Sequence, residues 1–403
     1  MNNVEPLKVK GFERYAFSFF GQYVLFYAGQ SIVNTYMNLY LNSIGLSKMM
    51  IGTIVAVSTL LATLMQPVMG YVSDEAKSKN RVLAGLYLAV VVLSLMFYIN
   101  TGYWYLIVIS ALFYIFFNPI AGLQDNLTLE FLAENQDRKT RWDYGKIRVG
   151  GTIGYCIMVL ISGFVFHDQY SQMFIGISLF LVPCAILVVR LPLIEGHRKG
   201  KQKTSVRILF RDRFLLNMYV VYIVFSIGLS YFYNFYSIYF VKALHARSSK
   251  VGIMMFVCAI TEVPMLFMIE KIKKKMGIRG LFLMAGLVTA MRWILLSYVT
   301  NPNAAIAVNL LHGAGYTSIS YCMVTYIAET APKDLMATGQ MLNVIIASAL
   351  SKIFVGTVEA KATEVFGTPA VALMNGLVLA ASVAAFFFLT AQKKKKRTGG
   401  QGS

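Results

Sequence analysis

The chain has 403 residues, of which 57% are hydrophobic and only 14% are charged. A soluble domain typically has about 25% charged and about 45–50% apolar residues, and a disordered chain has few aromatic residues. With 28 Phe and 24 Tyr, this composition argues against both a soluble domain and a disordered chain. The net charge of +19 does not by itself indicate nucleic-acid binding, because the basic residues fall mostly in loops between apolar stretches.

Twelve stretches are long and apolar enough to cross a bilayer, which takes about 20 residues per helix. The sequence therefore predicts an all-α polytopic membrane protein with twelve transmembrane helices. No small-residue cleavage pattern follows the first stretch, so we expect it to remain as a span. The stretches are 14–42, 49–73, 82–100, 104–132, 146–167, 171–191, 214–243, 249–270, 280–299, 303–330, 334–358 and 367–391.

The distribution of Lys and Arg predicts the orientation of these spans. With the N-terminus in the cytoplasm, 29 of the 37 basic residues lie on the cytoplasmic side, five lie on the other side and three lie within spans. Both termini are therefore predicted to be cytoplasmic. Anionic lipid near the loops accounts for the basic charge without nucleic acid, and the short loops predict a bacterial plasma membrane.

The longest hydrophilic stretch divides the chain into two similar halves of six spans each. Ile51-Gly52, followed by a basic cluster, recurs about 200 residues later as Val251-Gly252 with a similar cluster. Such repeats are typical of transporters. We expect four segments, which are an N-terminal bundle at 1–191, a cytoplasmic linker at 192–213, a C-terminal bundle at 214–392, and a basic tail at 393–403 whose end resembles a cloning scar.

The cysteines and histidines form no pattern typical of a metal site or an active site. The four Cys lie within apolar stretches and the four His are scattered along the chain. We therefore expect no disulfide, metal or cofactor, and no enzyme activity.

Ionisable residues within the predicted spans are the first candidates for a functional site. A charge at the bilayer centre costs about 2.5–3.5 kcal/mol, so retained charges are usually functional. Asp125 and Glu130 on the fourth span and Arg148 on the fifth predict a buried pair between one acid and the arginine. The alternative is that Glu130 and Arg148 extend toward the cytoplasmic surface.

The second half contains its own set of intramembrane charges. Glu262 lies in the eighth span, Arg292 in the ninth, and His312 in the tenth. A carboxyl among apolar groups can bind and release a proton near neutral pH, which predicts a proton-coupling role for this set. The alternatives are that Glu262 and Arg292 neutralise each other and that His312 is a core residue. Lys352 is expected to extend out of the membrane.

Uncharged polar residues recur at helical spacing in matching spans of the two halves. Such stripes predict a hydrated central cavity, although hydrogen bonds between helices use the same residue types. The stripes include Tyr23, Tyr27, Gln30, Asn34 and Asn38 on the first span, Ser226, Ser230, Asn234 and Ser237 on the seventh, and Asn309, His312, Tyr316 and Ser320 on the tenth.

The segment from Gly70 through Asp74 to Arg81 resembles the loop motif between the second and third spans of the major facilitator superfamily. It departs from that motif at Glu75 and Ser78. The resemblance covers the whole chain except the tail. It implies two six-helix bundles, and it implies that Gly70, Asp74 and Arg81 control conformation at the cytoplasmic face.

The segment 143–155 is similar to the start of the fifth span in one branch of that superfamily, the lactose, nucleoside and phenylpropionate permeases. That resemblance implies that Arg148 binds substrate and that Tyr155 stacks on it. Glu130 stands eighteen residues before Arg148, as the paired acid does in lactose permease, while the surroundings of Asp125 are closer to the phenylpropionate permeases. Either acid remains a candidate.

The charges of the second half match the same branch, with two departures. Glu262, Arg292 and His312 occupy matching positions, but Gly315 stands where lactose permease has its proton-carrying acid, and Asn309 stands where it has a lysine. The seventh span has no acid. The proton site is therefore assigned to Glu262 or a fourth-span acid.

Together these features predict a monomeric, proton-coupled importer that works by alternating access. Its solute is expected to be small and hydroxyl-rich, either an oligosaccharide or a nucleoside. Arg148 with Asp125 or Glu130, Glu262 with His312, and the polar residues Tyr155, Asn34, Asn234 and Tyr316 are the predicted binding residues. Glu262, Asp125, Arg292 and His312 are the predicted proton-coupling residues. An exporter of drugs or metabolites is the alternative, and the absence of proline near Gly150-Gly151 counts against it.

Overall fold

The computed structural model describes residues 11–99, 102–133, 142–166, 169–194, 211–331, 342–343, 345 and 349–398. Most of the predicted linker 192–213, the beginning of the stretch 334–358 and the last five residues lie outside these ranges. The side chains of residues 392–398 are also outside the description.

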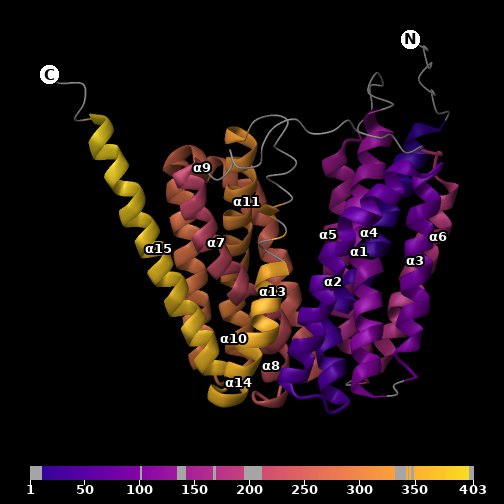
Figure 1. Cartoon of the computed structure of the whole chain (residues 1–403), viewed down its shortest axis with the longest axis horizontal. Coiled ribbons are helices and arrows are strands. Elements are labelled where there is room, and N and C mark those ends of the chain that lie inside the picture. Colours follow the sequence, from indigo (N-terminus) through magenta and orange to yellow (C-terminus); the bar gives the residue numbers. More distant parts are fainter. Residues whose placement is uncertain are drawn as a thin grey trace, which may run out of the picture. The chain divides into compact units, whose positions relative to one another are not determined.

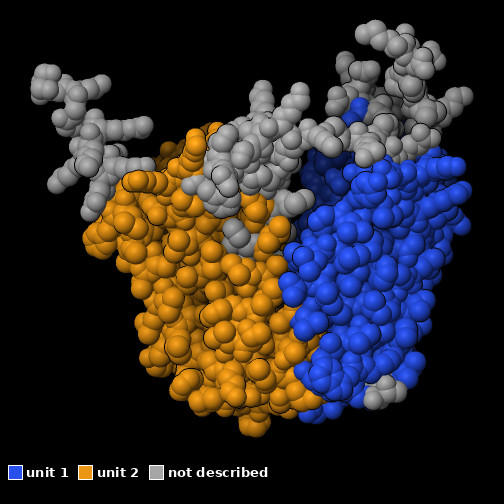
Figure 2. Space-filling view, viewed as in Figure 1, with its two compact units in different colours: residues 1–45, 57–200 blue, residues 46–56, 201–403 orange. Residues whose placement is uncertain are grey.

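Every element in the described part of the chain is a helix, and eight of these helices are long and apolar enough to cross a membrane. The chain groups into two compact units, residues 1–45 with 57–200 and residues 46–56 with 201–403 (Figure 2). The first residues of the second helix thus belong to unit 2, and the division after residue 200 falls within the predicted linker 192–213.

Unit 1 is built from long helices (Figure 1). They are α1 (Phe12–Ser43), most of α2 (Lys48–Glu75), α3 (Lys79–Met96), α4 (Tyr103–Ala133), α5 (Tyr144–Val165), the short η1 (Tyr170–Gln172) and α6 (Met173–Arg190).

Unit 2 contains more interruptions, including two π-helices, η3 and η6. Its elements are α7 (Arg213–Tyr231), η3 (Phe232–Tyr236), α8 (Ser237–Lys242), α9 (Ser248–Tyr298), α10 (Pro302–Val308), η4 (Asn309–Leu311), α11 (His312–Thr330), α13 (Ser351–Phe354), η6 (Val355–Glu359), α14 (Ala360–Phe366) and α15 (Thr368–Thr398).

The element α9 covers both the eighth and the ninth predicted stretches. Its backbone leaves the helical conformation at Gly277, where φ is 71° and ψ is 167°. Positive φ is readily adopted by glycine alone, so this residue allows the chain to change direction between the two stretches.

Close helix packing in unit 1 brings α1 against α5. A Cβ atom at Gly154 would lie 2.0 Å from the carbonyl oxygen of Val24, and one at Gly150 would lie 2.8 Å from that of Phe20. The missing side chains therefore let the two backbones touch. This contact places the tyrosines of α1 beside Arg148 of α5.

A matching contact in unit 2 joins α9 and α11. A Cβ atom at Gly313 would lie 2.1 Å from the carbonyl oxygen of Thr261, and the Gly313 amide donates a hydrogen bond to the Thr261 hydroxyl at 3.1 Å. Because Glu262 follows Thr261 and His312 precedes Gly313, the packing brings these two ionisable residues together.

Candidate functional site

Arg148 in unit 1 is held by aromatic rings. Its guanidinium carbon lies 4.2 Å from the ring centroid of Tyr27 and 5.8 Å from that of Tyr23, and the two rings are stacked at 6.1 Å. Arg148 is half-buried. A cation over an aromatic face is stabilised without using its N–H groups, so the guanidinium donors stay available.

Asp125 lies in the same cluster but is bound to a tyrosine. The Tyr23 hydroxyl donates to Asp125 Oδ1 at 2.5 Å, and Tyr144 at the beginning of α5 lies near the same carboxylate. No acid in the described ranges is within ion-pairing distance of Arg148. The predicted direct pair is therefore not formed, because Tyr23 and Tyr27 occupy the space beside the guanidinium.

Glu130 has a different partner. Lys79, at the beginning of α3 and only 5% exposed, lies 2.6 Å from Glu130 Oε1 and 3.3 Å from Asp74 Oδ1. Of the two fourth-span acids, the structure thus brings Asp125 to the Arg148 cluster and holds Glu130 at Lys79.

The remaining predicted binding residues of unit 1 lie around this cluster or apart from it. Tyr155 is half-buried on α5, two turns after Arg148, and Asn34 is exposed on α1.

Asp143 caps the beginning of α5 through a 2.9 Å hydrogen bond that its carboxylate accepts from the Lys146 amide. That hydrogen bond holds the pKa of Asp143 below its ordinary value.

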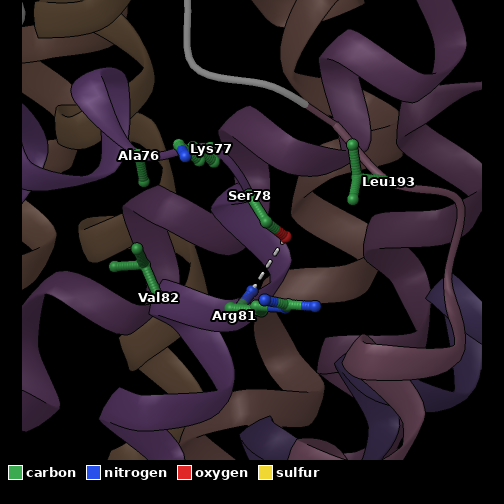
Figure 3. A pocket seen from close by; sticks show the side chains of 6 residues that line it. All are labelled: Ala76, Lys77, Ser78, Arg81, Val82 and Leu193. Atoms are coloured by element: carbon green, nitrogen blue, oxygen red, sulfur yellow. Dashed lines mark hydrogen bonds between the residues drawn. The ribbon is translucent and has the colours of Figure 1, made fainter.

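The loop that resembles the superfamily motif contains the ion pair between Asp74 and Lys79. Arg81 is exposed, and its backbone amide donates to the Ser78 hydroxyl at 3.3 Å. Ser78 and Arg81 line a pocket of about 270 Å³ together with Ala76, Lys77, Val82 and Leu193 (Figure 3). None of the predicted solute-binding residues lines this pocket.

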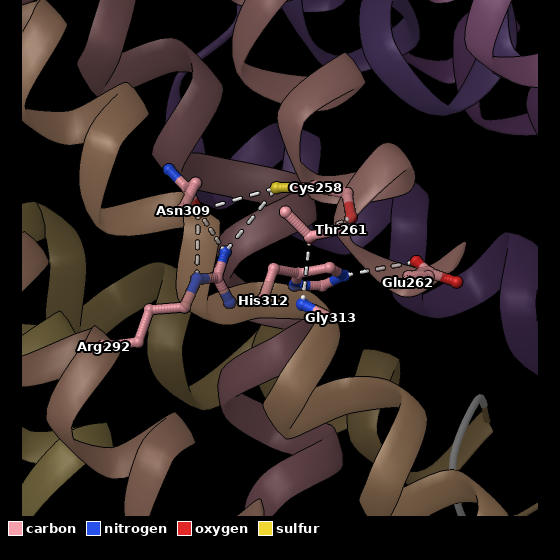
Figure 4. A network of polar contacts seen from close by, with 7 residues as sticks. All are labelled: Cys258, Thr261, Glu262, Arg292, Asn309, His312 and Gly313. Carbon is pink, nitrogen blue, oxygen red and sulfur yellow. Dashed lines mark hydrogen bonds and ion pairs between the residues drawn. The ribbon is translucent and has the colours of Figure 1, made fainter. Parts of the chain in front are cut away.

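In unit 2, Glu262 and His312 form a pair. Glu262 Oε1 lies 3.5 Å from His312 Nε2, and His312 is 1% exposed (Figure 4). The imidazole stacks on Tyr316 at 5.3 Å, and Tyr233 approaches it edge-on at 6.3 Å. Neither imidazole nitrogen makes a hydrogen bond within the described residues.

Arg292 is 1% exposed and is bound by neutral groups (Figure 4). Its Nε and one terminal nitrogen donate to Asn309 Oδ1 at 3.0 Å and 2.5 Å, and Cys258 Sγ lies 4.0 Å away. The guanidinium carbon lies 4.2 Å from the ring centroid of Phe232. The alternative in which Glu262 neutralises Arg292 is therefore not observed.

Asn234 of η3 is buried, and its amide donates to the Ser230 carbonyl at 2.7 Å. Lys352 of α13 makes no ion pair within the described residues. The sequence interpretation missed three partners, namely Lys79 for Glu130 and Asn309 with Cys258 for Arg292. Asn309 stood in the polar stripe of the tenth span, so its burial was signalled although its partner was not.

Comparisons with known proteins agree with this architecture. The chain is 25% identical to "Uncharacterized transporter YwbF" of Bacillus subtilis over 83% of both chains, and 26% identical to the maltose permease of Geobacillus stearothermophilus over 77% of both. The crystal structure of the nucleoside transporter NupG superposes with a TM-score of 0.78 at 16% identity, covering 93% of this chain and 98% of that one.

The sequence model of the MFS_1 like family matches residues 17–394. That match spans nearly the whole chain, and the matched relatives are permeases and transporters. The chain therefore belongs to the MFS_1 like family of the major facilitator superfamily, as a multi-pass membrane transporter and not an enzyme.

Proposed function

We propose that this transporter imports a small hydroxyl-rich solute, an oligosaccharide or a nucleoside, together with protons. We further propose a monomer with twelve spans and both termini in the cytoplasm of a bacterial cell. The names of relatives support this solute class, since they include maltose, lactose, melibiose, raffinose and sucrose permeases and a nucleoside transporter.

The observation that carries the solute class is the Arg148 cluster. Its guanidinium rests on Tyr27 and has no acid partner within the described residues, while Asp125 is held close by through Tyr23. The cluster thus combines planar donors, a carboxylate acceptor and aromatic faces. Hydroxyl-rich rings need both donors and acceptors along their edges, and their apolar faces pack on aromatic rings.

The pair of Glu262 and His312 supports proton coupling. Arg292 is bound to Asn309, and His312 is the basic side chain that lies within ion-pairing distance of Glu262 in the described residues. His312 is charged only when protonated. A proton that binds to either member therefore changes the charge of the pair, which is the property a proton-coupled carrier requires.

An aromatic carboxylate is the second candidate solute. An arginine without an acid partner is well suited to bidentate binding of a carboxylate. One relative, 23% identical over 78% of this chain, is named a probable 3-phenylpropionic acid transporter.

A ligand screen on the purified protein tests the solute class. Thermal shifts with sugars, nucleosides and arylpropionates are compared between wild type, Arg148→Ala and Lys146→Ala, where Lys146 is an exposed residue on the same helix. We expect a sugar or a nucleoside to stabilise wild type and Lys146→Ala but not Arg148→Ala. Stabilisation by arylpropionates alone would establish the second candidate, and an unchanged shift in Arg148→Ala would contradict this binding site.

Uptake into proteoliposomes tests the coupling. With a solute identified by the screen, an imposed proton gradient should drive accumulation by wild type, whereas Glu262→Gln should only equilibrate the solute. Accumulation by Glu262→Gln equal to wild type would contradict the proposed proton site. Solute movement out of the vesicles against its gradient, driven by protons moving inward, would establish the exporter.

A further inference from the structure

Unit 2 contains another buried acid, Glu359, apart from the pair of Glu262 and His312. Glu359 is 8% exposed and ends the π-helix η6, eight residues before the turn at Gly367. Short π-helices occur frequently at functional sites. Its carboxylate oxygen Oε2 is fully enclosed and has no hydrogen-bond partner within the described residues.

The groups around this carboxyl are polar but neutral. Thr363 donates to the Glu359 carbonyl at 2.6 Å and meets the Tyr231 hydroxyl of α7 at 3.0 Å. Asn375 of α15 approaches the carboxyl, yet its Nδ2 is buried without a hydrogen-bond partner in the described ranges. The side-chain amide of Asn375 is therefore a neutral polar neighbour of the Glu359 carboxyl in one enclosed place.

No described cation neutralises Glu359. Of the nearby basic residues, Lys48 binds the Thr368 hydroxyl at 3.2 Å, and Lys352 and Lys361 make no ion pair within the described residues. Tyr231 is the titratable group that faces the carboxyl from α7. An ionised carboxylate buried without a cation is strongly disfavoured, whereas a protonated carboxyl is tolerated.

The same π-helix carries a close contact with the beginning of α2. A Cβ atom at Gly52 would lie 2.3 Å from the carbonyl oxygen of Gly356, and one at Gly356 would lie 2.2 Å from that of Gly52. Nearby, the Met49 amide donates to Glu364 Oε1 at 2.8 Å. The helix that buries Glu359 is thus the helix against which α2 packs within unit 2.

We propose that Glu359 is a second proton-binding site, and that its protonation holds residues 48–56 of α2 against η6. When the carboxyl is ionised, hydration of the charge requires water to enter, and this loosens the packing around η6. The role of Glu359 in transport rests on the proposed function. Its protonation and the contact of α2 with η6 do not, because both are measured without any solute.

Thiol labelling of Ala56→Cys measures the contact directly. Ala56 is 6% exposed and its Cβ atom faces Gly356, while the four native cysteines are buried. In the purified Ala56→Cys protein, we expect the rate of maleimide labelling to rise with pH. The rise should be steeper than in the double variant that carries both Ala56→Cys and Glu359→Gln. The labelling rate of Ala56→Cys divided by that of the double variant should increase about tenfold per pH unit, at pH values below the midpoint of Glu359 ionisation. This slope follows because the loss of a single proton controls the opening of the contact between α2 and η6.

Two further variants separate the outcomes. Glu364→Gln removes the charge of an exposed acid five residues away and keeps an oxygen that can accept from the Met49 amide, so it should leave the wild-type pH response unchanged. Asn375→Leu should move the response to higher pH, because the ionised carboxylate loses a nearby donor. The infrared band of a neutral buried carboxyl should be lost in Glu359→Gln and kept in Glu364→Gln.

An identical pH response in the presence of Glu359→Gln would overturn the inference. A response that follows the sodium concentration instead of pH would also overturn it, because the site would then bind a metal cation. Glu262→Gln should keep the pH response of labelling. If this variant loses proton-driven uptake but labels normally, the result bears on the proposed function and not on the role of Glu359.

Discussion

Two arginines, one in each unit, have similar aromatic neighbours but different hydrogen-bond partners. The guanidinium carbons of Arg148 and Arg292 both lie 4.2 Å from an aromatic centroid, that of Tyr27 in unit 1 and that of Phe232 in unit 2. Arg292 is fully buried and bound to Asn309, whereas Arg148 is half-buried and donates no hydrogen bond within the described residues.

The difference shows that burial of a charge within a membrane span does not by itself identify a binding residue. Two nitrogens of Arg292 already donate to Asn309 within the protein. The donors of Arg148 are not used, which leaves them for a ligand. The predictions below test this division, from the largest expected effect to the smallest.

Removal of the partner of Arg292 should have the largest effect. Asn309→Leu leaves a buried guanidinium without its acceptor, and we expect a loss of about 3–5 kcal/mol of stability. The measurement is thermal unfolding in detergent, with Asn303→Leu, at an exposed position on α10, as the control. A melting temperature equal to wild type in Asn309→Leu would mean that Asn309 does not stabilise the arginine.

Removal of Arg148 should reduce binding more than stability. We expect Arg148→Met to weaken solute binding by about 10- to 100-fold, or about 1.4–2.7 kcal/mol. Its unfolding temperature should stay near that of wild type, because the side chain is half-exposed and no buried partner is left unpaired. Unfolding of Arg148→Met at a temperature as low as that of Asn309→Leu would assign a structural role to both arginines.

Lys79→Met tests whether Glu130 belongs to the Arg148 cluster. The substitution leaves the carboxylates of Glu130 and Asp74 without their shared cation. Because both acids are partly exposed, we expect a loss of only about 1–2 kcal/mol of stability. Solute affinity, measured by calorimetry, should be unchanged, and a clear change in affinity would place Glu130 within the binding site.

The cap of α5 should have the smallest effect. Asp143→Ala should cost about 1 kcal/mol or less at neutral pH. The pKa of Asp143 is held below its ordinary value, so its contribution is present above about pH 4 and is lost as the pH falls further. The difference in melting temperature between the variant and wild type should therefore shrink in acid. A difference that persists there would exclude the carboxylate as its source.

Much of the fold was predictable because hydrophobic length is a strong signal in a membrane protein. The start of α1 at Phe12 and the end of α6 at Arg190 lie within a few residues of the predicted stretches. The eighth and ninth predicted stretches lie on either side of Gly277 in α9, where the backbone leaves the helical conformation, but hydropathy does not report the backbone path between them. The π-helix η6 likewise has no signature in composition.

The sequence indicated candidate site residues, but it gave only some of the contacts that these residues make in the structure. The sequence indicated Arg148, Asp125, Glu262 and His312, and the structure brings the last two to 3.5 Å. The pairing of Glu130 with Lys79 was missed, because Lys79 reads as a loop residue and becomes buried only through tertiary packing. Glu359 was missed as a site because it follows the end of a predicted span.

Calorimetry with Arg148→Lys tests the central distinction most directly. Lysine keeps the charge but loses the planar array of donors that a ring of hydroxyls or a carboxylate would contact. With the solute found in the screen, we predict an affinity at least about tenfold weaker than wild type, while Lys146→Arg binds as wild type does. Equal affinity in Arg148→Lys and wild type would show that Arg148 contributes only charge, and would contradict its role as the residue that binds the solute.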